Sequence, residues 1–193
     1  MKPKLYIIAG CNGAGKTTAS FTILPEILNV QEFVNADEIA RGISPFQPEK
    51  AGIEAGRIML ERIDDLIARK VDFAFETTLA TRSYAGKIKK AKVQGYYVIL
   101  IFFWLESIEL AKERVNVRVS EGGHNIPEDI IERRYNRGLR NFFQLYQNEV
   151  DEWMFMDNSY GNFDLISKSD QHKNQIVIND EIWSTLERNC YEK

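Results

Sequence analysis

The segment from Gly10 to Thr17 constrains the fold of this chain more than any other. It reads Gly-Cys-Asn-Gly-Ala-Gly-Lys-Thr and comes directly after an apolar run, Leu5 to Ala9. This is the complete pattern of a phosphate-binding loop (P-loop), in which glycines permit a tight turn and consecutive backbone N–H groups surround phosphate oxygens. The following residues, Thr17 to Leu24, can begin a helix whose positive dipole end faces the phosphates. The sequence therefore predicts a nucleoside triphosphate site in an α/β fold.

Individual residues of the loop have separate predicted tasks. Lys16 is expected to reach the β- and γ-phosphate oxygens, and Thr17 is placed to be a Mg²⁺ ligand. A glycine turn that matches the pattern by chance is the alternative, which the full match and its flanking strand and helix disfavour. Cys11 would be reactive only if the helix N-terminus lowered the pKa of its thiol, and we expect it to have no role. The predicted nucleotide-binding residues are Gly10, Asn12, Gly13, Ala14, Gly15, Lys16, Thr17 and Thr18.

Composition bounds the remaining possibilities. With 193 residues, 44% hydrophobic and 27% charged, the chain suits a single globular domain over residues 1–193. A net charge of −3 gives no electrostatic argument for a nucleic-acid partner. The longest apolar stretch, Tyr96 to Leu105, is well short of the ~20 residues of a membrane span. Without a signal peptide or a metal-type cysteine spacing, we expect a cytoplasmic protein with reduced thiols and no membrane partner.

Apolar runs alternate with segments of helical periodicity along most of the chain. This alternation predicts a three-layer α/β/α sandwich with a mainly parallel five-stranded sheet. The expected strands are Leu5–Ala9, Glu32–Asn35, Phe73–Glu76, Tyr97–Leu105, and either Met154–Met156 or Ile176–Ile178. The expected helices include Pro48–Lys70, Ser83–Gln94, Ser107–Val119 and one from Pro127 to about Val150. The polar tail after Ser167 gives little indication of its structure.

Two carboxylates follow predicted strands. Asp37 comes after the short second strand and Glu76 ends the third, and the carboxyl ends of such strands open onto the ligand crevice of an α/β sheet. Asp37 could take the proton of an acceptor hydroxyl; alternatively, Asn35 or Asp37 caps the following helix. Glu76 could hold a metal-bound water or an acceptor hydroxyl, or cap a helix. We expect Thr78 and Arg82 to join Glu76 in binding a substrate.

The region from about 114 to 140 has the composition of a helical lid. A glycine-containing segment, Ser120 to Asn125, separates two arginine-bearing helices, and closure of such a lid would bring guanidinium groups to a transferring phosphoryl. Alternatively, the arginines form a solvated helix face. We expect Arg114 and one of Arg133 or Arg134 to act, while His124 could contact a phosphate or simply be solvated. The full set of arginines is Arg114, Arg118, Arg133, Arg134, Arg137 and Arg140.

Taken in order, these motifs resemble the zeta-toxin family of P-loop kinases, in particular its shorter chromosomal branch that is sometimes labelled as predicted ATPases. The resemblance covers most of Tyr6 to Ser159. Its motifs are the P-loop, Asn-Ala-Asp-Glu-Ile-Ala from Asn35, Phe-Glu-Thr-Thr-Leu from Phe75, the glycine-histidine lid with Pro127 and Arg-Arg-Tyr, and Met-Asp-Asn-Ser ending at Ser159.

The resemblance implies an ATP- and Mg²⁺-dependent kinase in which Asp37 is the general base and Glu76 and Thr78 orient the acceptor. In the best-described members the acceptor is UDP-N-acetylglucosamine, phosphorylated at a sugar hydroxyl. Two departures concern the lid and the N-terminus. The family's arginine before the proline is replaced around His124 and Asn125, which would shift charge stabilisation to Arg133 or Arg134. The chain also begins at its first strand, so the sequence offers no upstream segment for an antitoxin partner.

Two other classes of protein share some of these features. An ATP-binding-cassette-type ATPase would account for the P-loop, with Ser120–His124 imitating its signature loop and Trp153–Asp157 its acidic strand, but neither imitation holds in detail. A non-catalytic nucleotide-binding module is the other alternative. A guanine-specific switch lacks its Asn-Lys-x-Asp motif here. The function we predict is transfer of the ATP γ-phosphoryl group to a hydroxyl of a small-molecule acceptor.

Overall fold

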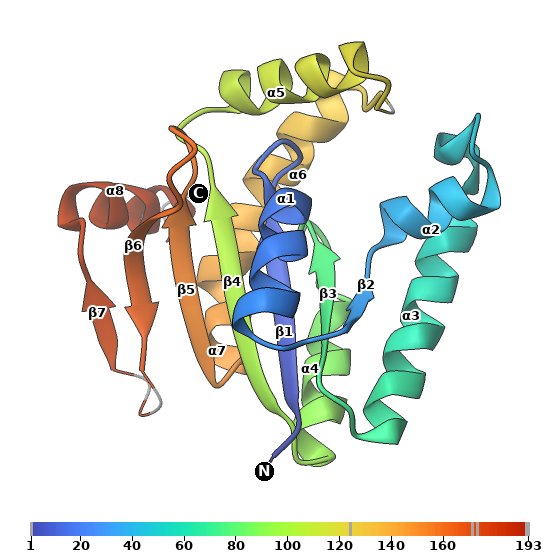
Figure 1. Cartoon of the computed structure of the whole chain (residues 1–193). Helices are drawn as coiled ribbons and strands as arrows, with labels where there is room; N and C mark the ends of the chain where they lie inside the picture. The colour runs from blue at the N-terminus through green and yellow to red at the C-terminus, as the bar shows by residue number, and fades with distance from the viewer. Residues whose placement is uncertain (1, 124, 171, 173, 192–193) are drawn as a thin grey trace.

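The computed structural model describes residues 2–123, 125–170, 172 and 174–191. Within these residues the chain forms a seven-stranded sheet in the order β2-β3-β1-β4-β5-β6-β7 (Figure 1). The five strands from β2 to β5 are parallel, whereas β6 and β7 are antiparallel additions at one edge. The strands are β1 (Lys4–Gly10), β2 (Glu32–Val34), β3 (Phe73–Thr77), β4 (Tyr97–Trp104), β5 (Glu152–Asp157), β6 (Asp164–Ser169) and β7 (Gln175–Val177).

Helices cover both faces of the sheet, which confirms the predicted α/β/α layering. Among the described helices, none has the length and hydropathy that crossing a membrane requires. The π-helical segments η1 and η3 extend α1 and α6, and the 3₁₀ turn η2 precedes α3. The helical elements are α1 (Lys16–Thr22), η1 (Ile23–Ile27), α2 (Ala36–Ile43), η2 (Pro48–Ala51), α3 (Gly52–Arg69), α4 (Tyr84–Val93), α5 (Ile108–Ser120), α6 (Glu128–Asn141), η3 (Phe142–Tyr146), α7 (Gln147–Glu149) and α8 (Asp180–Tyr191).

The predicted number of five strands was wrong, because β6 and β7 extend the sheet beyond β5, and β7 lies in the polar tail after Ser167. Both segments offered as alternatives for the fifth strand carry strands, β5 and β7, and β6 lies between them. All three residues of β7 are exposed, and β6 buries mainly Ile166, Ser167 and Ser169. An antiparallel edge with one exposed face has no continuous apolar run, so its sequence does not show the pattern of the central strands.

The core lies on both sides of β1, whose successive side chains alternate between the two faces. Leu5 and Ile7 face the layer formed by α3, α4, α6, η3 and α8, where Trp183 is also buried. Tyr6 and Ile8 face α1, η1 and α5. Burial of both faces fixes the central parallel strands, and their carboxyl ends meet at the edge where the P-loop begins (Figure 1).

Candidate functional site

The P-loop connects β1 to α1 and lies directly under α5. Gly13 has a positive φ of 80°, and a Cβ atom there would stand 2.8 Å from the backbone oxygen of Ala111 in α5. Glycine is therefore required both by the turn and by the close approach of the helix. Figure 1 shows the loop at the upper end of the sheet, beneath α5.

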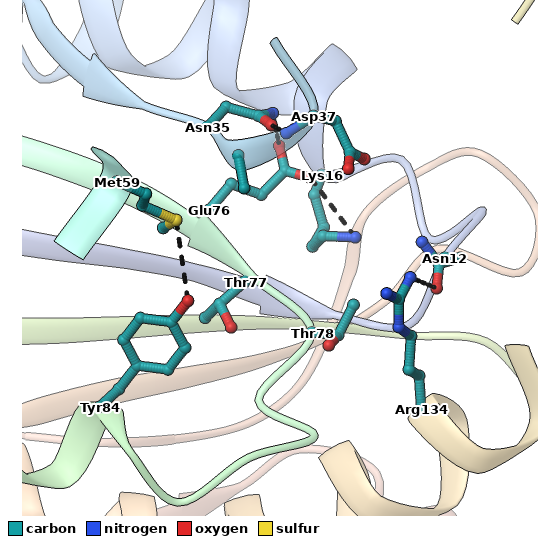
Figure 2. A pocket seen from close by; sticks show the side chains of 11 residues that line it. Asn12, Lys16, Asn35, Asp37, Met59, Glu76, Thr77, Thr78, Tyr84 and Arg134 are labelled. Carbon is teal, nitrogen blue, oxygen red and sulfur yellow. Dashed lines mark hydrogen bonds and ion pairs between the residues drawn. The ribbon is translucent and has the colours of Figure 1, made fainter. Parts of the chain in front are cut away.

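Glu76 is the centre of a network that joins the P-loop to the end of β3. Lys16 Nζ lies 3.5 Å from Glu76 Oε1, and the Thr17 hydroxyl donates to Oε2 at 2.8 Å. The Asn35 amide donates to the same oxygen at 3.0 Å. The side chains of Lys16 and Glu76 are only 7% and 9% exposed, and two such charges persist in the interior because each has close partners. Figure 2 shows the side chains of Lys16, Asn35 and Glu76 close together beside a cavity.

The sheet register accounts for this network. Glu76 lies beside Ile8 in the parallel pairing of β3 with β1, two residues before β1 ends at Gly10. A carboxylate at that register reaches the first turn of α1, which begins at Lys16. The structure thus places Glu76 beside the P-loop residues Lys16 and Thr17.

Asn35, and not Asp37, caps helix α2. The Asn35 side-chain oxygen accepts hydrogen bonds from the backbone N–H groups of Asp37 at 2.8 Å and Glu38 at 3.4 Å. The cap that the sequence left open between two residues is therefore filled by Asn35. The Asp37 carboxylate is left to line the cavities beside it.

Three neighbouring cavities meet at Asp37. The P-loop cavity, about 270 Å³, is lined by the P-loop and by α5. The central cavity, about 160 Å³, lies among the ends of β2 and β3 and includes Lys16, Glu76, Thr78 and Arg134 in its lining (Figure 2). The outer cavity, about 330 Å³, lies between the α2–η2 segment and the start of α6. Asp37 lines all three cavities and so lies at their junction.

The predicted lid arginines divide among these cavities. Arg114 lines the P-loop cavity and donates through Nη2 to the backbone oxygen of Ser159 at 2.8 Å. Arg134 lines the central and outer cavities and donates to Asn12 Oδ1 at 3.2 Å, and Arg133 lines the outer cavity. Burial lowers the pKa of the Arg134 guanidinium, an effect that the Asp37 carboxylate opposes. Arg134 thus bridges the P-loop and Asp37 electrostatically.

Other predicted residues differ in their placement. Thr78 lines the central cavity, whereas Arg82 lines none of these three cavities and instead donates to Asn141 Oδ1 at 3.4 Å. His124 lies outside the described residues. Burial raises the pKa of the Cys11 thiol to about 11, despite the nearby Lys16, so the thiol is protonated at neutral pH.

Two residues of the site were not singled out from the sequence. Arg118, one turn after Arg114, lines the P-loop cavity, and its Nε and Nη2 atoms are buried with no hydrogen-bond partner among the described residues. The i, i+4 spacing from Arg114 was the available signal, because it puts both side chains on one face of α5. Tyr84 lines the central cavity, donates to the Met59 sulfur at 3.7 Å and has a pKa raised by burial. No motif in the sequence marks it.

Comparison with known proteins agrees with this architecture. A chain of the AvrRxo1-ORF1:AvrRxo1-ORF2 complex crystallised with sulphate aligns with a TM-score of 0.78 and 15% identity, over 96% of this chain and 64% of that one. This chain thus spans slightly less than two thirds of that protein. A structure from the PezAT toxin-antitoxin system of Streptococcus pneumoniae aligns with a TM-score of 0.70 and 16% identity, over 100% of this chain and 88% of that chain.

Sequence comparison gives the family. An uncharacterized protein of Haemophilus influenzae is 36% identical over 136 residues, which are 70% of this chain and 94% of that protein. The family model "Zeta toxin" matches residues 1–160, a range that holds the P-loop, Asp37, Glu76 and the arginines of α5 and α6. The protein is therefore a member of the zeta toxin family.

Proposed function

We propose that the protein is an ATP-dependent kinase that transfers the γ-phosphoryl group to a hydroxyl of a small-molecule acceptor. The observation that carries this proposal is the position of Asp37 at the junction of the P-loop cavity with the central and outer cavities. Phosphoryl transfer needs the acceptor hydroxyl in line with the γ-phosphate and a proton acceptor beside that hydroxyl. Asp37 lines the cavity proposed for the nucleotide and the one proposed for the acceptor, so it would lie beside a hydroxyl that meets the γ-phosphate between them.

The nucleotide side is formed by the P-loop and α5. Backbone N–H groups of the loop and Lys16 would bind the phosphates. Arg118, whose Nε and Nη2 atoms have no hydrogen-bond partner in the described part of the chain, would donate to a phosphate oxygen. A chain of the AvrRxo1 complex crystallised with ATP shares the fold at a TM-score of 0.76, which supports ATP as the nucleotide.

The residues around Thr17 fit a Mg²⁺ ion. Mg²⁺ prefers oxygen ligands and is usually held by one or two protein groups together with phosphates and waters. The Thr17 hydroxyl and the Glu76 carboxylate supply such oxygens, 2.8 Å apart and next to Lys16. When bound, the ion would offset the charge on the β- and γ-phosphate oxygens. We assign Thr17 as a direct ligand and Glu76 as the carboxylate that orients it.

The acceptor side is the central cavity. Asp37 would take the proton of the acceptor hydroxyl, and Thr78 and Tyr84 would position the acceptor by hydrogen bonds. Arg134, which shares this cavity with Asp37 and contacts the P-loop at Asn12, would stabilise the charge on the transferring phosphoryl group.

The acceptor we propose is a nucleotide-activated amino sugar such as UDP-N-acetylglucosamine. The central and outer cavities share Ala36, Asp37 and Arg134, so one extended molecule could occupy both. Arg133 in the outer cavity would then bind its diphosphate, because a guanidinium matches the geometry of phosphate oxygens. The sugar hydroxyl would lie beside Asp37.

Labelled ATP provides the test. Incubating the protein with γ-labelled ATP, Mg²⁺ and UDP-N-acetylglucosamine should produce a labelled sugar nucleotide, and Lys16→Ala should reduce its formation at least 100-fold, a magnitude on the order of that for one lost charge-stabilising group. A metabolite extract in place of the sugar nucleotide tests the acceptor separately. If the label appears in another small molecule, the proposed kinase activity stands and the proposed acceptor is wrong. Release of phosphate alone would indicate an ATPase, and ATP binding without turnover a binding module.

A further inference from the structure

Asn158 connects the loop after β5 to the P-loop, although 144 residues separate the two partners in sequence. Its backbone N–H donates to the Trp104 oxygen at 3.0 Å, which extends the pairing of β5 with β4 by one residue. Its side-chain Nδ2 donates to the backbone oxygen of Ala14 at 2.9 Å. The residue is only 4% exposed. The sheet thus holds the amide of Asn158 against the P-loop.

The bond to Ala14 determines where the next N–H group points. The peptide unit between Ala14 and Gly15 is planar and trans, so its C=O and N–H groups point in opposite directions. A P-loop binds phosphate through N–H groups, and Gly15 lines the P-loop cavity. With the Ala14 oxygen held on the side of Asn158, the Gly15 N–H is directed to the opposite side of the loop.

Gly15 makes such a restraint necessary. It has φ of 80°, in the region that glycine enters freely, and a glycine on one side of a peptide unit lowers the cost of rotating that unit. A Cβ atom at Gly15 would stand 2.5 Å from Asn158 Nδ2, so the amide packs directly on the glycine. Because Gly15 has no side chain, Asn158 can pack directly on it. The orientation of the peptide unit between Ala14 and Gly15 is then fixed by the hydrogen bond from Asn158 to the Ala14 oxygen.

The other half of the Asn158 amide argues against a purely structural role. Its Oδ1 atom is buried and has no hydrogen-bond partner among the described residues. A buried acceptor without a partner costs free energy, whereas an apolar side chain of similar shape would avoid that cost. The gain that retains an asparagine here is its donor contact with the P-loop.

We infer that Asn158 is a positioning residue for nucleotide binding, which keeps the Gly15 N–H directed at the phosphates by holding the Ala14 carbonyl. This inference rests on the proposed function, since it assumes that the P-loop binds phosphates. It assigns to the loop after β5 a role in the affinity for the diphosphate portion of the nucleotide, separate from any contact with the base.

Nucleotide titration tests this role with two variants and a control. Asn158→Leu keeps the approximate shape and removes both the donor and the unpartnered acceptor, and Asn158→Ala removes the whole amide. Both variants should reduce the affinity for ATP roughly 3- to 10-fold, the range expected for one hydrogen bond. The affinity for inorganic pyrophosphate should fall by the same factor. The exposed neighbour Asn162, in the variant Asn162→Ala, should leave both affinities unchanged.

Thermal unfolding of the nucleotide-free protein separates positioning from stability. Asn158→Leu removes the unpartnered Oδ1 atom but also takes the donor from the buried Ala14 oxygen, so the two effects offset and the variant should unfold near the wild-type temperature while its pyrophosphate affinity falls. A loss of ATP affinity without loss of pyrophosphate affinity, or unchanged affinity for both in a folded Asn158→Leu protein, would overturn the inference. If Lys16→Ala retains pyrophosphate binding, the proposed function itself fails. If Lys16→Ala loses pyrophosphate binding while Asn158→Leu keeps wild-type affinity, the proposed function stands and only the role of Asn158 is wrong.

Discussion

The hydroxyl of Thr17 donates a hydrogen bond to Glu76 Oε2 at 2.8 Å, which joins the first turn of α1 to the end of β3. Lys16 Nζ lies 3.5 Å from the other oxygen of the same carboxylate. The two P-loop residues predicted to meet the phosphates and the metal therefore already share one anionic partner. Phosphate oxygens that approach Lys16 have to replace part of this ion pair, so the charge of Glu76 should influence how nucleotide and metal bind.

Replacing Glu76 with glutamine should separate metal binding from nucleotide binding. Glu76→Gln removes the negative charge while keeping the shape, so about tenfold more Mg²⁺ should be needed to reach half-maximal ATP affinity. Affinity for ATP in the presence of EDTA should stay the same or rise, because Lys16 loses a competing anion. ATP affinity measured in EDTA and then at increasing Mg²⁺ concentrations gives the metal-free affinity and the Mg²⁺ midpoint. Glu32→Gln, whose carboxylate pairs with Arg62 instead, is the control. An unchanged Mg²⁺ midpoint in Glu76→Gln would remove Glu76 from the metal site.

Asp37→Asn should retain ATP binding and lose phosphoryl transfer. The amide cannot accept the acceptor proton, and loss of a general base typically reduces the rate by about 10²- to 10⁴-fold. ATP affinity and product formation are measured on the same preparation. Glu38→Gln changes the next carboxylate along α2, which pairs with Arg41 on the surface, and should keep full activity. Full transfer activity in Asp37→Asn would contradict the assignment of the base.

Arg118→Ala should weaken ATP binding or transfer at least tenfold, because Arg118 lines the P-loop cavity and its Nε and Nη2 atoms have no hydrogen-bond partner among the described residues. Arg137→Ala removes an exposed arginine of α6 and should have little effect. Titration with ATP and initial-rate measurements compare the two variants. If the two variants have the same ATP affinity and the same initial rate, the position of Arg118 at the P-loop cavity has no functional consequence.

Two glycines in helices should respond oppositely to alanine. A Cβ atom at Gly138 in α6 would stand 2.3 Å from the backbone oxygen of Thr78, so Gly138→Ala should destabilise the protein by about 1–3 kcal/mol and displace Thr78 from the central cavity. Gly86 in α4 has no neighbour within 4 Å of such an atom, so Gly86→Ala should stabilise by about 0.5–1 kcal/mol. Urea unfolding of both variants measures the difference. Stabilisation of Gly138→Ala would show that α6 can move away from β3 at little cost.

The two cysteines should make stability fall in alkaline solution. Burial raises the pKa of the Cys11 and Cys190 thiols from 9.0 to about 11. The folded state therefore holds these protons more tightly than the unfolded state does. Their stabilising contribution is complete below pH 9 and is lost progressively as the pH rises toward 11.

Unfolding free energy measured between pH 8 and about 10.5 checks this expectation. For each protein, the free energy of unfolding is expressed as the change from its own value at pH 8. This change should be smaller in Cys11→Ala than in the wild type. Alkylation by N-ethylmaleimide should be slow in the native protein and fast in urea, since a buried thiol of raised pKa supplies little thiolate. Rapid native alkylation of Cys11 would show that its thiol is accessible and ionised.

The amino-acid sequence by itself determined the elements whose signals are local. The P-loop pattern, the apolar central strands and the order in which Asp37 and Glu76 follow them were all readable, because each depends on neighbouring residues or on one strand or helix period. The family could be inferred from the same motifs. The edge strand β6 was not predicted, and β7 was offered only as an alternative fifth strand, Ile176–Ile178, since pairing with neighbouring strands and not composition makes these segments strands.

Only the tertiary structure decided which side chains meet. Register between β1 and β3 brings Glu76 to Thr17 across 59 residues, and the loop after β5 brings Asn158 to Ala14 across 144. The same packing directs Arg118 into the P-loop cavity and Arg82 to Asn141 instead of the three cavities at Asp37. Sequence patterns specify the direction of a residue within its own helix or strand. The contacts between elements depend on how several of them bury their apolar faces together, and no single segment carries that information.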